Sequence, residues 1–350
     1  MNKVILGKKQ LGMDEPCFTI AEAGANHEGS LEKAFQLIDA AKQSGADSIK
    51  FQTYKAVELT TTTAPKYWDD NIENETQFDV FQKLDSFEND DWRQVFEYAE
   101  QKNIICFSTP FDEKSAELLY SLNVPAFKIA SADITHIPLI NYVASKKLPI
   151  FLSTGMASHD EIKEAIDEIQ NCGNDKIILL HCMTSYPTKI EDANLEMIKT
   201  LKNDFSECII GYSDHTLGSM IPALSVCYGS KVVEKHFTFD KKLNTSRDHR
   251  LSLNEDEFRE MIENIRTAES SKGQSFRLDF DNEKESVKYA RRSIVSTQKI
   301  QKNTVLLPEM LAIKRPGTGI QPKFLKKIIG KKTTKDIDMD VVVNWDDILI

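Results

Sequence analysis

Two histidines stand at the ends of two successive strand-like runs. His215 ends the run CIIGYSDH, and His236 lies near the end of KVVEKHF. Side chains two positions apart on a strand share a face, so Ser213 accompanies His215 and Glu234 accompanies His236. A further histidine, His181, ends an earlier run and has either an orienting or a catalytic role. Although a lone histidine more often bonds a neighbouring strand, the pair predicts a divalent-metal site on His215 and His236, with coordination positions left open for water and substrate oxygens.

Two lysines occupy strand positions that point into the predicted fold. Lys50 lies in DSIKFQT and Lys128 in PAFKIAS, and each has the inward parity of its strand. A buried lysine requires a compensating anion, which could be a ligand or a protein carboxylate such as Glu22 or Glu234. Hydroxyl groups at the ends of other strands add hydrogen-bond donors. With the lysines they favour a site for a phosphorylated small molecule; these residues are Thr109, Ser131, Ser153 and Ser213.

The elements that must position these residues alternate between strands and helices. Strand-like runs, each followed by a helix-like segment, recur as CFTIAEAG, DSIKFQT, IICFSTP, PAFKIAS, PIFLSTG, KIILLHC, CIIGYSDH and KVVEKHF. The helix after the first run shows apolar spacing at Leu31, Phe35 and Ile38, with Gly45 as its expected C-cap. The unbroken series, without a Gly-rich dinucleotide fingerprint, predicts an α/β fold that closes as a (β/α)8 TIM barrel with its active site at the C-terminal ends of the strands.

Changes in composition divide the chain into three parts. Residues 1–270 form the predicted catalytic barrel, and the polar residues 271–288 are typical of a linker. Residues 289–350 contain short strand-like runs broken by Pro and Gly, which predict a small, mainly β domain that leans on the barrel or on a second subunit. Residues 58–78 make a connection longer than one helix requires, and we expect them to cover the barrel mouth as a lid.

Charge and hydropathy exclude several classes of protein. The net charge is −10 at pH 7, so a general nucleic-acid or anionic-membrane surface, which would require a basic field, is not expected. No run approaches the roughly 18 apolar residues of a membrane span, and the first residues lack a signal-peptide pattern. The six cysteines have neither metal-ligand nor redox spacing. We therefore expect a cytoplasmic enzyme with reduced thiols.

Ordered motifs along the chain resemble those of the sialic acid synthase family. In the barrel they are IAEAGANHEGS, KFQTY, FSTPF, FKIAS, STGM, HCMTSYPT, GYSDHT and EKHFT. The tail motifs ARRSIVS, KRPGTGI and IIGKK resemble the antifreeze-like SAF domain, a β-clip fold that follows the barrel in those enzymes. The resemblance covers nearly the whole chain, and the ordered set is far more specific than any one motif.

The resemblance implies a reaction and its partners. Such enzymes condense phosphoenolpyruvate with an N-acetylated hexosamine, such as N-acetylmannosamine or a 2,4-diacetamido-trideoxyhexose, to give a nine-carbon 2-keto acid and phosphate. It also implies a divalent ion, Mn²⁺ first with Mg²⁺ or Co²⁺ as alternatives, and a domain-swapped homodimer.

The resemblance also assigns roles to residues. Phosphoenolpyruvate would be held by Lys50, Thr109, Lys128, Ser131, Ser153, Thr184 and Ser213. Catalysis would fall to the metal-binding His215 and His236 and to two carboxylates that position water or transfer protons, without a ranking between them: Glu22 and Glu234. The sugar would contact Asp133, Tyr186 and Asp248, and also Arg315 from the other subunit.

Departures from the family pattern fall at positions expected to face the sugar. Ala132 and Asp133 stand where many members have Gly and Glu, which shortens the carboxylate by one methylene. Ser246 and Arg247 replace the usual Gly and Pro before Asp248. Thr184 occupies the place of an asparagine found in members that make N-acetylneuraminate. The resemblance therefore leaves the identity of the sugar open.

Two other interpretations fit parts of the pattern. A barrel aldolase, or another phosphoenolpyruvate-dependent synthase, could act on a sugar phosphate, with Lys50 or Lys128 forming a Schiff base in the aldolase. A non-catalytic carbohydrate-binding protein is the second alternative, but it would have no reason to keep lysines and paired histidines at the strand ends.

Overall fold

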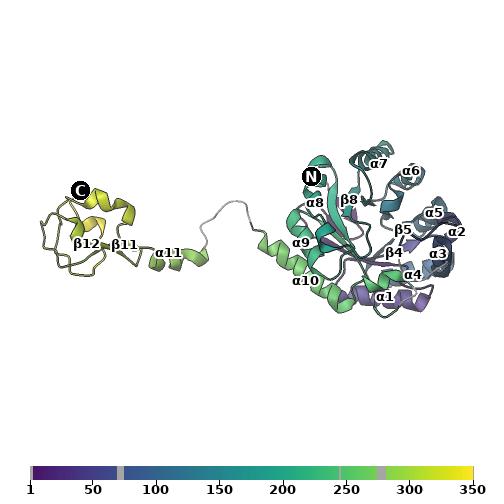
Figure 1. The fold of residues 1–350 in the computed structure, drawn as a ribbon, viewed down its shortest axis with the longest axis horizontal. Coiled ribbons are helices and arrows are strands. Elements are labelled where there is room, and N and C mark those ends of the chain that lie inside the picture. The colour runs from purple at the N-terminus through teal and green to yellow at the C-terminus, as the bar shows by residue number, and fades with distance from the viewer. Residues whose placement is uncertain (1–2, 69–74, 244–245, 274–280, 350) are drawn as a thin grey trace. The chain divides into compact units, whose positions relative to one another are not determined.

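The structure is a computed structural model that describes residues 3–68, 75–243, 246–273 and 281–349. The chain divides into two units, Met1–Gly273 and Gln274–Ile350, which are coloured from purple to green and from green to yellow in Figure 1. Each unit is described by itself.

The first unit is a closed barrel of parallel strands, as the sequence predicts. Within the described residues its strands are β3 (Phe18–Gly24), β4 (Ser48–Thr53), β5 (Ile105–Pro110), β6 (Phe127–Ile129), β7 (Ile150–Ser153), β8 (Ile177–Cys182), β9 (Ile209–Asp214) and β10 (Val232–His236). The last strand, β10, pairs with both β9 and β3 and so closes the barrel. The TIM-barrel prediction is confirmed, and each strand falls inside its expected run.

Helices follow the strands and surround the barrel (Figure 1). They are α1 (Leu31–Ser44), α4 (Asn89–Gln101), α5 (Glu113–Ser121), α6 (Ile137–Ser145), α7 (His159–Asn171), α8 (Met197–Asp204), α9 (Met220–Tyr228) and α10 (Glu255–Ser271), with the shorter α2 (Ala56–Leu59) and α3 (Gln77–Leu84) between β4 and α4. Gly45 ends α1 in the left-handed conformation, at φ 86°, and its N–H bonds the carbonyls of Ala41 and Lys42. The expected C-cap is therefore confirmed.

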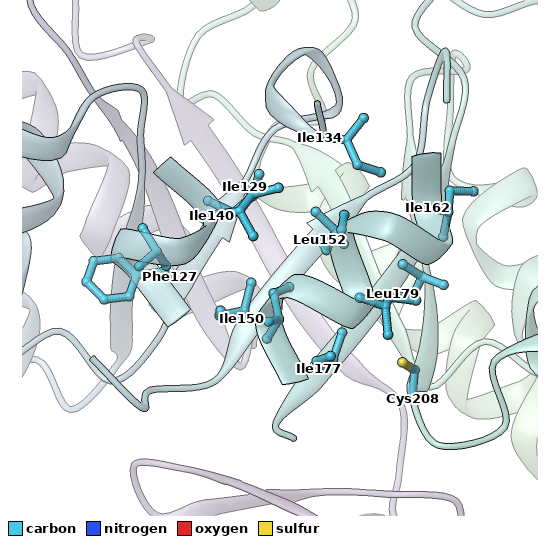
Figure 2. Close-up of a cluster of buried hydrophobic side chains, with 14 of the residues drawn as sticks. Phe127, Ile129, Ile134, Ile140, Ile150, Leu152, Ile162, Ile177, Leu179 and Cys208 are labelled. Atoms are coloured by element: carbon cyan, nitrogen blue, oxygen red, sulfur yellow. The ribbon is translucent and has the colours of Figure 1, made fainter. Parts of the chain in front are cut away.

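Strand alternation divides the apolar side chains between two cores. Figure 2 shows Ile150 and Leu152 of β7 within the core between strands and helices, together with Ile140 of α6 and Ile162 of α7. Phe151, which lies between Ile150 and Leu152 in the sequence, belongs instead to the core inside the barrel. Packing against the helices therefore determines which strand residues point outward. The alternate residues must then point into the barrel.

A hairpin that the sequence analysis did not predict contributes to the interior core. β1 (Val4–Leu6) and β2 (Lys9–Leu11) pair antiparallel, and their apolar side chains pack with Phe18 and Val232. Phe18 and Val232 begin β3 and β10, so the hairpin covers the N-terminal ends of these strands. The predicted site residues of the barrel lie at the opposite, C-terminal ends of the strands.

The second unit is small and has its own apolar core. β11 (Ser293–Ser296) and β12 (Leu311–Lys314) pair antiparallel, and α12 (Leu325–Ile328) adds Ile328 to a core that includes Ile294 and Val343. Of the expected linker 271–288, residues 274–280 lie outside the described residues, and the last part is helical because α11 (Lys284–Ala290) begins there. None of the helices described is both long and apolar enough to cross a membrane.

Leu152, on the face of β7 that packs against the helices, gives a prediction about stability. Leu152 is 0% exposed, so Leu152→Ala should lower the free energy of unfolding by about 2–5 kcal/mol through lost burial and the cavity left behind. Leu217 is 59% exposed, and Leu217→Ala should change the same quantity by less than about 0.5 kcal/mol. Urea unfolding of the two variants measures both values. Equal effects would contradict the assignment of Leu152 to the core.

Candidate active site at the barrel mouth

A cavity of about 470 Å³ lies at the C-terminal ends of the strands. Except for His181, the site residues predicted in the barrel line it: Glu22, Lys50, Thr109, Lys128, Ser131, Asp133, Ser153, Thr184, Tyr186, Ser213, His215, Glu234, His236 and Asp248. A larger hollow of about 760 Å³ beside α2, α4 and α5 is lined by none of them. The smaller cavity is therefore the candidate active site.

Four buried charged groups form its floor. Lys50 Nζ lies 2.5 Å from Glu22 Oε2 and 3.8 Å from Glu234 Oε2, and Lys128 Nζ lies 3.1 Å from Glu234 Oε1. Ser213 Oγ donates to Glu234 Oε1 at 2.8 Å. Protein carboxylates therefore compensate the charge of the lysines, which is the alternative to a ligand anion that the sequence analysis left open. They also line the cavity, so the same ammonium groups can reach an anionic ligand.

The two carboxylates differ in how readily they bind a proton. Burial raises the pKa of Glu22 to about 7, with Lys50 opposing the shift and Glu234 adding to it. Burial acts in the same direction on Glu234, but Lys128 and Lys50 outweigh it and hold the pKa of Glu234 at about 2. Carboxyl groups whose pKa values are pushed apart in one site are suited to different roles in proton transfer.

The two histidines lie side by side at the cavity wall. The ring centroids of His215 and His236 are 5.3 Å apart. His215 Nδ1 is 2.7 Å from the carbonyl oxygen of Met183; a proton on Nδ1 would donate there and leave Nε2 free as a ligand. Burial lowers the pKa of His236 to about 3, so its ring is neutral, and its Nδ1 has no hydrogen-bond partner among the described residues.

These donors fit a divalent ion bound by two imidazoles. Across the described parts of the chain, no group of three or more His, Cys, Asp or Glu residues is arranged to hold a metal. The protein would therefore supply two ligands and leave the rest to water or substrate, as the sequence analysis expects. Cys182 lies 3.8 Å from His215 Nδ1 and raises the pKa of His215 although burial opposes it, so proton and metal would compete for this ring.

A second buried ion pair stabilises the strands that carry the histidines. Lys235 and Asp214 are register partners on β10 and β9, each directly precedes a histidine, and their charged atoms are 2.5 Å apart. Strand alternation turns both side chains away from the cavity. Asp214 also accepts from Tyr212 Oη at 2.8 Å, and Lys235 donates to the backbone of Thr216. The pair therefore fastens the ends of two adjacent strands.

Residues on loops form the other end of the cavity. The ring of Tyr186 lies 4.1 Å from that of His215, and Asp248 Oδ2 lies 3.8 Å from His236 Nδ1. Of the segment expected as a lid, Leu59, Tyr67 and Gln77 line the cavity, whereas residues 69–74 lie outside the described residues. Arg247, which the sequence analysis noted only as a departure, also lines this end.

Two other predicted positions lie outside the cavity. His181 has outward parity, stacks near Tyr212 and places Nε2 3.0 Å from the carbonyl oxygen of Ala193, so its side chain packs outside the barrel and does not line the cavity. The alternation Leu180, His181, Cys182 could have shown this, because Leu180 is in the interior core and Cys182 lines the cavity. Arg315 is exposed in the second unit, directly after β12.

Comparison with known proteins places the chain in a family. Residues 37–277 match the NeuB family, and residues 291–349 match the SAF domain. The chain belongs to the NeuB family. Among NeuB relatives, an uncharacterized protein of Methanocaldococcus jannaschii is 42% identical over 349 residues, covering 100% of this chain and 99% of that protein. The N,N'-diacetyllegionaminic acid synthase of Legionella pneumophila is 40% identical over 354 residues, covering 99% of each.

A solved structure supports the same assignment. The N-acetylneuraminic acid synthetase of Leptospira borgpetersenii, in complex with citrate, is 34% identical with a TM-score of 0.72, covering 82% of this chain and 95% of that one. The chain is thus a NeuB-family nonulosonic acid synthase, an enzyme that condenses phosphoenolpyruvate. The non-catalytic interpretation is set aside.

The pair between Lys235 and Asp214 can be tested by removing its cation. Lys235→Met leaves the Asp214 carboxylate buried without a counter-charge and should lower the free energy of unfolding by about 3–5 kcal/mol. Lys241 pairs with Glu257 where both are 38% exposed, so Lys241→Met should cost less than about 1 kcal/mol. Denaturant unfolding compares the variants; a loss of similar size in both would contradict the role given to the buried pair.

Proposed function

We propose that this enzyme condenses phosphoenolpyruvate with an N-acetylated hexosamine, either N-acetylmannosamine or a 2,4-diacetamido-trideoxyhexose. The products would be a nine-carbon 2-keto acid and phosphate. The observation that carries the proposal is one cavity that joins the buried lysines Lys50 and Lys128 to the histidine pair His215 and His236. An anionic substrate and a polarised aldehyde can therefore meet within it.

The lysine end is assigned to phosphoenolpyruvate. Lys50 already donates to Thr109 Oγ1 at 3.1 Å, and the Ser131 hydroxyl accepts from the Gly155 N–H at 2.9 Å. The buried Ser153 Oγ makes no hydrogen bond within the described part of the chain, so it is available to donate to a ligand oxygen. We assign Thr184 and Ser213 to the same substrate from their places along the cavity. Charge-assisted bonds from the two lysines would provide most of the binding.

The reaction forms one carbon–carbon bond and one carbon–oxygen bond to water, and it breaks the carbon–oxygen bond to phosphate. The methylene carbon of phosphoenolpyruvate attacks the aldehyde carbon of the open-chain sugar, whose oxygen becomes a hydroxyl. Positive charge develops at the carbon that carries the phosphate; water adds there, and phosphate leaves with the bridging oxygen. We assign Glu22 and Glu234, which flank Lys50, to position this water and carry its proton. A divalent ion on His215 and His236 would polarise the aldehyde.

The second unit is assigned to the acceptor sugar in a dimer. We propose that Arg315 reaches the N-acetyl group in the active site of the partner, as in a domain-swapped homodimer. Its support is the match of residues 291–349 to the SAF domain and the exposure of Arg315.

Phosphate release tests the reaction. The full-length protein, with Mn²⁺ and phosphoenolpyruvate, should release phosphate with N-acetylmannosamine or 2,4-diacetamido-2,4,6-trideoxymannose, and mass spectrometry should find the corresponding 2-keto acid. Omission of the sugar is the control. Absence of release with every amino sugar would refute the proposal, and borohydride trapping of substrate on Lys50 or Lys128 would point to an aldolase instead.

Metal binding provides a test that does not depend on turnover. His236→Ala removes one of the two proposed ligands, so the affinity for Mn²⁺ measured by calorimetry should fall by more than about tenfold. His159 is a suitable control because its side chain is 56% exposed beside Asp204, and His159→Ala should leave the affinity unchanged. Unaltered Mn²⁺ binding in His236→Ala would show that His215 and His236 are not the metal site.

A further inference from the structure

Arg247 lies among aromatic rings from two separate segments at the loop end of the cavity. Its guanidinium carbon is 3.9 Å from the ring centre of Trp68 and 5.5 Å from those of Tyr67 and Tyr186. Its Nη2 also donates to Tyr67 Oη at 3.4 Å. Arg247 begins the 3₁₀ turn Arg247–Arg250 after β10, so these contacts hold that loop against the segment after α2 and the loop after β8.

One nitrogen of this guanidinium makes no hydrogen bond to any residue that the structure describes. Among the described residues, Arg247 Nη1 and Asp133 Oδ2 are buried and make no hydrogen bond; Asp248 Oδ1 makes none either, although it lies 3.7 Å from Arg247 Nε. All three residues line the cavity. A buried polar atom without a hydrogen bond is costly, so Arg247 Nη1 and Asp133 Oδ2 in one cavity point to a ligand that offers an acceptor to the first and a donor to the second.

Contacts along the cavity show which part of the acceptor would reach Arg247. Glu234 contacts the lysines, and His236 follows two residues later on the same face of β10. Tyr186 packs against His215, and Arg247 packs against Tyr186. With phosphoenolpyruvate at the lysines and the aldehyde at the histidines, Arg247 lies beyond the aldehyde, at the distal end of the sugar.

The wall beside Arg247 is apolar. Phe81 lies 6.1 Å from Trp68 between ring centroids, and Leu59, Val80 and Leu84 line the same cavity. A methyl group against this wall would bury apolar surface, whereas a hydroxyl group there would lose its hydrogen bonds to water. The site thus combines a charged donor with an apolar surface.

We propose that Arg247 is a specificity-determining residue that selects acceptors with an acylamido group at the distal end. Nη1 donates to the amide carbonyl, Asp133 or Asp248 accepts from the amide N–H, and the apolar wall receives the methyl groups. This inference rests on the proposed condensation. It makes a 2,4-diacetamido-trideoxyhexose, rather than N-acetylmannosamine with its distal hydroxyls, the better acceptor.

The experiment compares two acceptors with the full-length enzyme, Mn²⁺ and phosphoenolpyruvate. The wild type should show the higher kcat/KM with 2,4-diacetamido-2,4,6-trideoxymannose. Arg247→Met keeps an apolar stem against Trp68 but removes the donors, so kcat/KM for this sugar should fall by about 10-fold to 100-fold. The kcat/KM for N-acetylmannosamine and the KM for phosphoenolpyruvate should change by less than about threefold.

Two further variants separate selection from folding. Arg250 lies in the same turn, is exposed and donates to the carbonyl of Tyr186 at 3.1 Å, so Arg250→Met should leave the ratio between the two acceptors unchanged. Arg247→Lys keeps one charged donor and should give an intermediate ratio; it replaces Arg247→Met if thermal unfolding shows that the latter does not fold.

The outcomes distinguish the inference from the reaction on which it rests. Phosphate release with an unchanged acceptor ratio in Arg247→Met, or with an equal loss for both sugars, overturns the role of Arg247 and leaves the condensation standing. A wild type that releases no phosphate with either sugar overturns the condensation, and the acceptor preference falls with it.

Discussion

The alternation of side chains along the barrel strands is the constraint on which the site depends. Closure of the barrel turns every second residue inward, and helix packing fixes the parity because the other residues must enter the outer core. On β10 this places Glu234 inside and Lys235 outside, and on β9 it places Ser213 inside and Asp214 outside. A shift of strand register by one residue would turn Lys235 and Asp214 toward the cavity and would turn Glu234 and Ser213 away from it.

Charge compensation follows from this geometry. Lys50 and Lys128 stand above an interior that contains Phe107, Phe151 and Leu180, where an isolated ammonium would be unstable. Glu22 and Glu234 balance their charge, the Thr109 hydroxyl accepts from Lys50, and the Ser213 hydroxyl donates to Glu234. An anionic ligand would therefore compete with protein carboxylates for the lysines. This explains why the ion-pair interpretation and the ligand interpretation are both compatible with the structure.

The sequence predicts the parts of the fold that depend on local pattern, and misses those that depend on distant contacts. Strand positions, Gly45 at the end of α1 and the barrel residues of the cavity all follow from periodicity or motif. The sequence analysis left a catalytic role open for His181, although alternation from the inward Leu180 places the His181 side chain outward. The stacking of Arg247 on Trp68 joins loops 179 positions apart, and nothing in either local sequence indicates it. The hairpin β1–β2 was missed because each of its strands has only three residues.

The two proposed substrates contact parts of the barrel that differ in how readily their residues can be substituted. The groups assigned to phosphoenolpyruvate lie mainly on strands, where Lys50 and Lys128 are held by register and by buried partners. The groups assigned to the sugar lie on connections after the strands, including the 3₁₀ turns Ser131–Asp133 and Arg247–Arg250. Of the departures from the family pattern, Asp133 and Arg247 lie on these turns, and Thr184 lies on the connection after β8. Loops can change without altering strand register, so acceptor choice can vary while the chemistry at the strand ends is preserved.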